Sequence, residues 1–283
     1  MAAPAGRLRF GTSSWSEKAW SGVFYPAGLP AGLQLAHYAQ RFDTVEADVT
    51  YYRVPDERLV RGWELKTPPG FKLSAKFPRS VVHAGEGAEP DAARVLEPEH
   101  CARDVERFLA SMSLLGSKCG PLVLQFPYFN RRAFARPEPF LERLERFLSG
   151  LPAGFRYGVE LRNPSWYDAP LFELLRAQRT ALVLVDLAYL PHPDELFERG
   201  DPFTTDFAYA RLIGDRKKID ALTDTLDRVV LDQGPRLERW ARLLLAARER
   251  VPETYVYANN HYAGYAPDTI ADLAARVDAS GAR

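Results

Sequence analysis

Cysteine and histidine are scarce in this sequence, and their scarcity narrows the classes of function. The 283 residues include two cysteines and five histidines, too few for a disulfide framework and without the spacing of a zinc site. Lys and Arg together number 37, and so do Asp and Glu. A balanced charge gives no general reason to expect binding to a nucleic-acid backbone, although a local basic site is compatible with it.

Long apolar runs are also missing. No stretch approaches the roughly 20 apolar residues that cross a bilayer, and residues 1–10 lack the apolar centre of a signal peptide. We therefore expect a cytoplasmic protein with no membrane partner. The hydrophobic fraction of 46% is ordinary for a globular chain and leaves enough apolar side chains for a sizeable core.

Short β-like runs alternate with amphipathic segments along the whole chain. The expected strands cover residues 8–12, 44–48, 72–76, 122–125, 156–162, 181–186, 207–212 and 255–259. Helical periodicity lies between them, at residues 33–40, 59–65, 98–115, 138–148, 169–178, 235–250 and 267–277, with only a short turn near 194–199.

Repeated βα units predict a parallel sheet, and about eight of them predict closure into a barrel. We therefore expect the α/β class, with residues 1–283 forming a single TIM-like (β/α) barrel. An open, doubly wound sheet is the alternative, but no glycine fingerprint of a dinucleotide fold follows any expected strand.

The segments that leave the expected strands are long, and those that enter them are short. The long segments cover residues 77–97, 126–137, 187–206 and 213–234. In a βα barrel all strand exits lie on one face, and long irregular segments in a compact domain usually serve binding or catalysis. Tolerated surface insertion is the alternative, because loop length costs little free energy.

Several expected strands carry polar residues near their carboxyl ends, where a barrel strand should be apolar on both faces. The two-residue period places Glu46 and Asp48 on one face of the second strand, and Glu160 and Arg162 on one face of the fifth. Arg211 occupies the corresponding position in the seventh. Because the active sites of βα barrels lie at this end, we expect these side chains to meet at the barrel mouth.

The residue types at these strand ends suit acid–base chemistry on an anionic ligand. The candidate catalytic groups are three carboxylates: Glu46, Glu160 and Asp186. The candidate ligand-binding groups at the same strand ends are bases and amides: Lys76, Gln125, Arg162, Arg211 and Asn259. A carboxylate beside a base stays ionised, as we expect for Glu160 beside Arg162, whereas one member of the pair Glu46 and Asp48 could retain a proton. A purely structural network of ion pairs is the alternative interpretation.

Three residues on strand-exit loops complete the candidate ligand-binding set. Ser13 offers a hydroxyl donor after the first strand, Trp15 offers an aromatic face, and His261 offers an imidazole for proton transfer. A tight turn, an apolar plug and a surface histidine are the structural alternatives.

No motif for an organic cofactor occurs, so the cofactor is unknown. Mg²⁺ or Mn²⁺ on the three carboxylates is a weaker alternative, because the nearby bases compete for the same oxygens.

A series of motifs extends over nearly the whole chain. In order, they are GTSSWS at 11–16, TVE at 44–46, TYYRVP at 50–55, TPPGF at 67–71, KFPR at 76–79, LG at 115–116, GP at 120–121, LQFP at 124–127, VELRNPSW at 159–166, TDF at 205–207, YARL at 209–212 and YANN at 257–260. Together they resemble the DUF72 (YecE-like) family. The resemblance implies a TIM-barrel-like fold and a biochemical role that is not established.

The chain departs from the pattern of that family at three positions. Ser14 stands where a second glycine is usual, Glu17 stands where a tyrosine or similar residue is usual, and Ile213 replaces a histidine that often follows the seventh strand. A mechanism that uses that imidazole is therefore not expected here.

These observations support three functional hypotheses. The first is an enzyme, a hydrolase or isomerase, that uses the carboxylates and bases of the barrel mouth on a polar anionic substrate such as a phospho-sugar or a nucleotide-like molecule. The second is a nucleic-acid binding or processing protein, with exposed aromatic side chains that stack on bases. The third is a non-catalytic ligand sensor or partner-binding scaffold that uses the same pocket.

Overall fold

The computed structural model describes residues 5–281 of the chain. Residues 1–4 and 282–283 lie outside the described residues, and with them the first part of the segment expected to lack a signal peptide. The strands of the described part are β1 (Arg7–Thr12), β2 (Thr44–Ala47), β3 (Lys72–Lys76), β4 (Cys119–Gln125), β5 (Tyr157–Glu160), β6 (Ala181–Leu187), β7 (Phe207–Gly214) and β8 (Glu253–Ala258). Its α-helices are α1 (Ala31–Tyr38), α2 (Glu57–Leu65), α3 (Arg79–Val82), α4 (Pro98–Ser113), α5 (Glu138–Ser149), α6 (Ala169–Ala177), α7 (Arg216–Asp220), α8 (Gly234–Arg250) and α9 (Ala266–Gly281).

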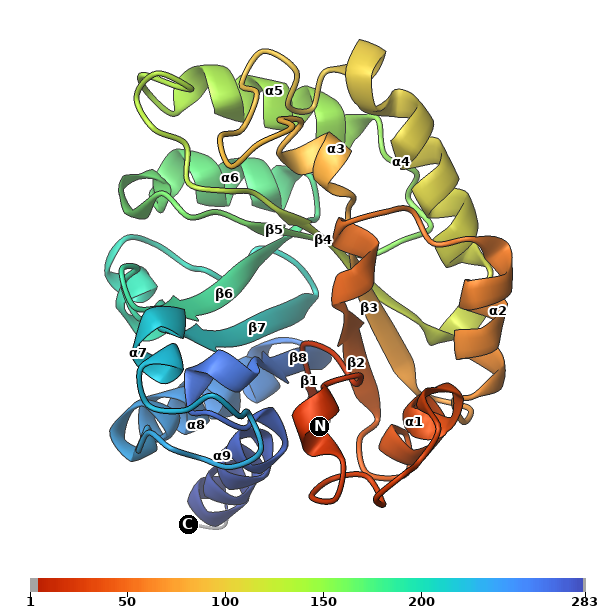
Figure 1. Cartoon of the computed structure of the whole chain (residues 1–283). Coiled ribbons are helices and arrows are strands. Elements are labelled where there is room, and N and C mark those ends of the chain that lie inside the picture. Colours follow the sequence, from red (N-terminus) through yellow and green to blue (C-terminus); the bar gives the residue numbers. More distant parts are fainter. Residues whose placement is uncertain (1–4, 282–283) are drawn as a thin grey trace.

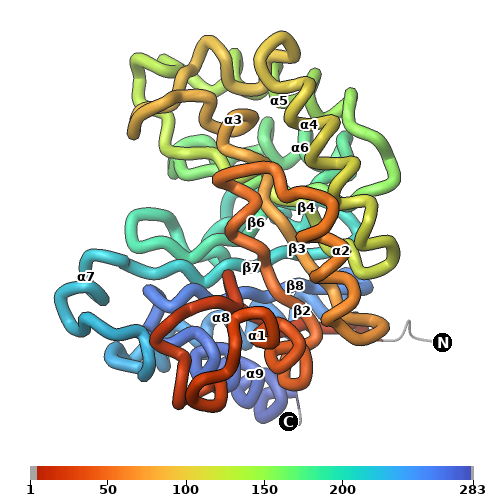
Figure 2. Tube along the Cα trace, turned by 45° about the vertical axis from the view of Figure 1, so that its right-hand side comes forward, coloured from red at the N-terminus to blue at the C-terminus, as the bar shows by residue number. Residues whose placement is uncertain are grey.

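Within residues 5–281, eight parallel strands form one nearly closed barrel. Hydrogen-bonded neighbours follow the order β1-β8-β7-β6-β5-β4-β3-β2, so each strand after the first lies beside the next one in the sequence. The helices surround the strands (Figures 1 and 2). The predicted α/β class and TIM-like barrel are therefore confirmed, and the open doubly wound alternative is excluded by the strand order.

β1 and β2 stand at the two ends of the hydrogen-bonded strand order, and a side chain of α1 connects them. The hydroxyl of Tyr38 in α1 accepts from the Thr12 backbone N–H at 2.8 Å and donates to the Thr44 carbonyl at 3.1 Å. The strands meet closely because Gly11 has no side chain: a Cβ there would lie 2.2 Å from the Thr44 carbonyl oxygen. A glycine is thus required at this seam.

The longer helices, such as α2, turn an apolar face toward the interior of the protein. In α2 the side chain of Asp56 accepts from the Leu59 N–H at 2.8 Å and starts the helix, while Val60 and Trp63 are buried three residues apart. The sixth helical position contains only the 3-10 segment η5 (Pro193–Glu198), as the nearby prolines predict. None of the helices in the described part is both long enough and apolar enough to cross a bilayer.

The barrel interior is polar at both ends. At the amino end, Arg9 and Arg156 pair with Glu253. In the middle, the hydroxyl of Tyr257 lies 2.6 Å from the Thr44 hydroxyl and 2.9 Å from that of Ser74. These buried hydroxyl contacts form the floor beneath the carboxyl end of the barrel, where the candidate site lies.

Candidate functional site

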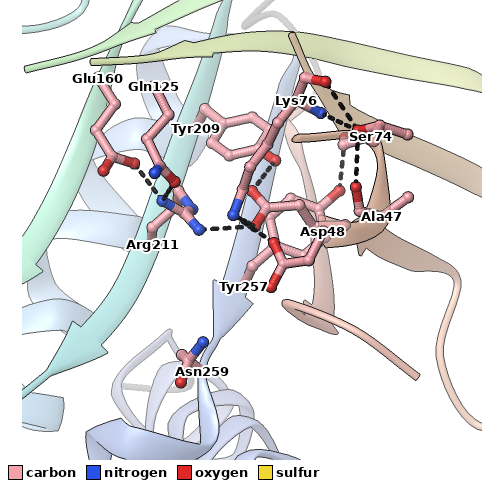
Figure 3. A network of polar contacts seen from close by, with 12 residues as sticks. Ala47, Asp48, Ser74, Lys76, Gln125, Glu160, Tyr209, Arg211, Tyr257 and Asn259 are labelled. Carbon is pink, nitrogen blue, oxygen red and sulfur yellow. Dashed lines mark hydrogen bonds and ion pairs between the residues drawn. The ribbon is translucent and has the colours of Figure 1, made fainter. Parts of the chain in front are cut away.

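Four strands deliver a charged side chain into the carboxyl end of the barrel. The side chains are those of Glu46 (β2), Lys76 (β3), Glu160 (β5) and Arg211 (β7), and all four are buried. Figure 3 shows Lys76, Glu160 and Arg211 pointing toward one another, and Glu46 contacts both Lys76 and Arg211. Each is an inward-facing residue at or near the end of its strand, so period-two alternation accounts for their meeting.

Arg211 connects the two buried glutamates. Its Nη2 lies 2.8 Å from Glu46 Oε1, and its Nη1 donates both to Glu160 and, at 2.8 Å, to Gln125 Oε1. Glu160 also pairs with Arg162 at 3.0 Å. A planar guanidinium can serve several carboxylate and amide oxygens at once, so Arg211 fixes the spacing of the cluster.

Lys76 links this buried cluster to the rim of the barrel. Its ammonium lies 3.4 Å from Glu46 Oε1 and also contacts the carboxylate of Asp48. Asp48 begins the 3-10 segment η2 (Asp48–Tyr51), directly after β2, and its side chain is 32% exposed. The Arg162 side chain is 25% exposed. Asp48 and Arg162 are therefore the charged members of the cluster that solvent reaches most readily.

Two tyrosines form the floor of the cluster. The Tyr209 hydroxyl donates to Glu46 Oε2 at 2.6 Å, and the ring of Tyr209 packs on that of Tyr257 with centroids 5.1 Å apart. Neither tyrosine is among the site residues predicted from the sequence. Each lies two residues before a polar residue that was predicted to face the site. The two-residue period of a strand therefore already places both tyrosines on the same face.

The surroundings separate the pKa values of Glu46 and Asp48. Burial alone would raise the pKa of Glu46, but the charges of Arg211 and Lys76 outweigh it and lower that pKa to about 2. For Asp48, burial and the nearby Glu46 charge raise the pKa above its ordinary value despite Lys76. Glu46 is therefore held ionised, and Asp48 is the carboxylate of the pair that more readily keeps or exchanges a proton.

Glu160 is also held ionised. Burial opposes its charge, but Arg211 and Arg162 more than compensate, so its pKa is lowered. This agrees with the expectation that Arg162 keeps Glu160 charged.

Among the buried polar atoms without a hydrogen-bond partner in residues 5–281 are Arg211 Nε, within the cluster, and Ser13 Oγ, one residue beyond β1. Trp20 Nε1 and His192 Nε2, on other strand-exit segments, also lack a partner. Ser13 follows β1, and its backbone N–H donates to the Ala258 carbonyl at 2.9 Å. Alternation from Arg9 through Gly11 directs Ser13 inward. A buried hydroxyl or guanidinium N–H without a partner is costly, so the Ser13 and Arg211 atoms call for water or a ligand.

The structure corrects the expectation that Asp186 joins the other carboxylates. Asp186 lies on the outer face of β6, where its carboxylate binds the guanidinium of Arg236 and accepts from Trp240 Nε1 at 2.9 Å, both on α8. It also accepts from the Tyr262 hydroxyl at 2.9 Å. Val183 faces the barrel interior. Because Asp186 lies three residues after it, alternation along β6 turns Asp186 outward. Asp186 thus anchors a helix to the barrel.

The other predicted ligand-binding residues lie around the cluster rather than within it. The Trp15 ring packs edge-on against Trp63 of α2, with centroids 5.7 Å apart. Asn259 stands apart from the Arg211 cluster (Figure 3), and its Oδ1 accepts from the His261 N–H at 3.0 Å. The His261 ring lies 3.3 Å from a carboxylate oxygen of Asp220, and burial lowers its pKa.

The carboxylate oxygens of the cluster are engaged by bases and by Tyr209. Across the residues that the structure describes, no group of three or more His, Cys, Asp or Glu side chains is arranged to hold a metal ion. The separation of Asp186 from Glu46 and Glu160 removes the three-carboxylate set considered from the sequence.

Comparison with known proteins identifies the family. The family model described as "Protein of unknown function DUF72" matches residues 9–283. The chain belongs to the DUF72 family. A curated relative, the UPF0759 protein YecE of Escherichia coli K12, is 32% identical over 160 residues, which cover 56% of this chain and 50% of that protein. The match thus spans about half the length of the curated relative.

Solved DUF72 structures share the whole fold. A DUF72 family protein from Thermotoga maritima is 27% identical, with a TM-score of 0.68 and coverage of 98% of this chain and 99% of that one. One from Enterococcus faecalis, 19% identical, also gives a TM-score of 0.68, with 96% of each chain covered, and supports the fold alone.

The departure of Ser14 from the DUF72 pattern has a structural cost. Its φ angle is +150°, in a region that side chains disfavour and glycine tolerates. The strained turn holds Ser13 and Trp15 at the exit of β1.

Proposed function

We propose that this DUF72 protein is an enzyme that binds a small polar anionic molecule at the barrel mouth and transfers a proton through Asp48. The proposal is carried by one observation: Ser13 Oγ and Arg211 Nε are buried without partners among the described residues, beside a cluster whose other charges are paired. A ligand whose polar groups reached either atom would supply the hydrogen bond that the atom lacks.

The chemistry assigns different tasks to the members of the cluster. Asp48 has a raised pKa and a partly exposed carboxylate, and so suits the giving or taking of a proton. Lys76 and Arg162 are already paired with Asp48 and Glu160, and their remaining N–H donors would hydrogen bond to the ligand. Glu46 and Glu160, first considered as catalytic groups, instead hold Arg211 and the two rim bases in position. A hydrolase or isomerase that works by carboxylate acid–base chemistry fits this division.

The test begins with a thermal-shift screen of phosphorylated metabolites, sugars and nucleotides. A compound at 100 times its Kd stabilises the fold by about 2.7 kcal/mol, and its conversion is then followed by NMR. Asp48→Asn should bind it but convert it about 100-fold more slowly or worse. Asp224→Asn, which alters an exposed aspartate away from the cluster, is the matched control and should convert it at the native rate.

Three results would contradict the proposal. Full turnover by Asp48→Asn would remove Asp48 from the chemistry. Stabilisation by a ligand that is never converted would favour a sensor. Binding to DNA or RNA that weakens steeply with salt, with no small-molecule ligand, would favour a nucleic-acid protein.

A further inference from the structure

A polar cavity lies outside the charged cluster, between the segments that follow β2 and β3 and the helix α4. Its volume is about 280 Å³, below the roughly 300–1,000 Å³ of cavities that enclose a whole drug-sized ligand. Its size therefore suits one chemical group of a larger molecule.

The charge of this cavity is positive. Its lining includes three arginines, Arg53, Arg79 and Arg107, and a single carboxylate, that of Asp104. The Asp104 carboxylate accepts a hydrogen bond from the Ser80 hydroxyl at 2.5 Å. Arg79 donates to the backbone carbonyls of the loop at residues 86–87, so a neutral partner fixes it and its charge is not cancelled. Arg53 and Arg107 are exposed and form no ion pair within the described part of the chain.

A short rigid segment joins this cavity to the barrel mouth. The Thr50 hydroxyl accepts from the Lys76 backbone N–H at 2.9 Å and donates to the Ala47 carbonyl, which fixes η2 against β3. Asp48 begins η2 on the side of the cluster, and Arg53 follows its end on the side of the cavity. Between them lies Tyr51. Burial raises the pKa of its phenol, and the charges of Arg79 and Arg162 offset part of that rise.

We infer that the cavity of Arg53, Arg79 and Arg107 binds the phosphate group of a phosphorylated ligand whose polar body occupies the barrel mouth. Guanidinium groups match phosphate oxygens in charge and geometry, and several of them around one small cavity favour a dianionic group. The inference rests on the proposed function, because it names the chemical class of the same ligand.

Calorimetric titration of the full chain with inorganic phosphate, against chloride at equal ionic strength, tests the subsite. Native protein should bind one phosphate, and Arg53→Gln with Arg107→Gln should weaken binding about 100-fold, or roughly tenfold for each lost charged hydrogen bond. Both side chains are exposed and unpaired among residues 5–281, so folding should survive. Arg103→Gln, on the exposed side of α4, is the matched control and should bind as native protein does.

The outcomes separate this inference from the proposed function. Asp48→Asn should keep native phosphate affinity, because Asp48 lies at the mouth and not in the cavity. Unchanged phosphate binding in the double variant would overturn the subsite, even if Asp48→Asn had lost turnover. Native protein that binds a DNA duplex but no inorganic phosphate would overturn it in favour of a polyanion surface.

Discussion

Replacing Arg211 with methionine removes the base that joins Glu46 to Glu160. Methionine is also long and unbranched, so the main change is the loss of charge and hydrogen bonds. Breaking a buried ion pair on one side costs about 3–5 kcal/mol. Here Glu46 keeps Lys76 at 3.4 Å and the Tyr209 hydroxyl, and Glu160 keeps Arg162 at 3.0 Å. We therefore expect the lower end of that range, about 3 kcal/mol.

Urea unfolding followed by tryptophan fluorescence measures this loss as a shift of the midpoint. Arg103→Met, an exposed change on α4, should alter stability by less than about 0.5 kcal/mol. Adding Glu46→Gln and Glu160→Gln to Arg211→Met should recover part of the loss, because no unpaired carboxylate then remains buried.

The stability lost in Arg211→Met should also become smaller as the pH falls from about 7 to about 4. In the variant, protonation of Glu46 or Glu160 removes a buried carboxylate charge that Arg211 no longer balances. Native Glu46, with a pKa of about 2, stays ionised over that interval. A loss below about 1 kcal/mol, or a triple variant no more stable than Arg211→Met, would refute the ion-pair account of the cluster.

Three further predictions concern stability. Native protein should lose stability as the pH falls from about 4.5 toward about 2, because Glu46 and Glu253 have pKa values lowered to about 2 and are therefore protonated first in the unfolded chain. Acid titration by circular dichroism checks this, and a free energy of unfolding that does not change over this pH interval would contradict it. Ser14→Gly should raise the Tm by relieving about 1 kcal/mol of backbone strain at φ +150°, whereas a lower Tm would count against that strain. Asp186→Asn should lower the free energy of unfolding in urea by about 2 kcal/mol, because it weakens the contacts of Asp186 with Arg236 and Trp240. Ligand binding at the barrel mouth should be preserved. Loss of ligand binding at unchanged stability would contradict the structural role of Asp186.

The sequence predicts the convergence of charge better than it predicts each residue's surroundings. Glu46, Glu160 and Arg211 occupy inward positions of short strands, and a closed parallel barrel brings such positions together wherever they lie in the chain. The same topology accounts for Lys76 and Gln125, which contact the cluster from β3 and β4.

Asp186 shows where the two-residue period fails. Every residue of β6 is buried, so its apolar run carries no signal for which face turns inward. The partner that fixes Asp186 outward, Arg236, lies 50 residues further along the chain. Proximity in sequence could not supply that pairing.

Asp48 shows a second limit. The sequence indicates that Glu46 or Asp48 could retain a proton, but which one depends on Arg211, a residue more than 160 positions away from either. The φ angle of +150° at Ser14 was also not predicted from the sequence, because serine itself does not favour that region.

At the barrel mouth, the pKa values of Glu46 and Glu160 are lowered and that of Asp48 is raised. An NMR titration of the side-chain carboxyl carbons, assigned by Glu46→Gln and Asp48→Asn, tests this difference most directly. The account predicts that Glu46 titrates near pH 2 and that Asp48 titrates above the ordinary aspartate value of about 3.9. Titration of Asp48 below Glu46 would contradict it.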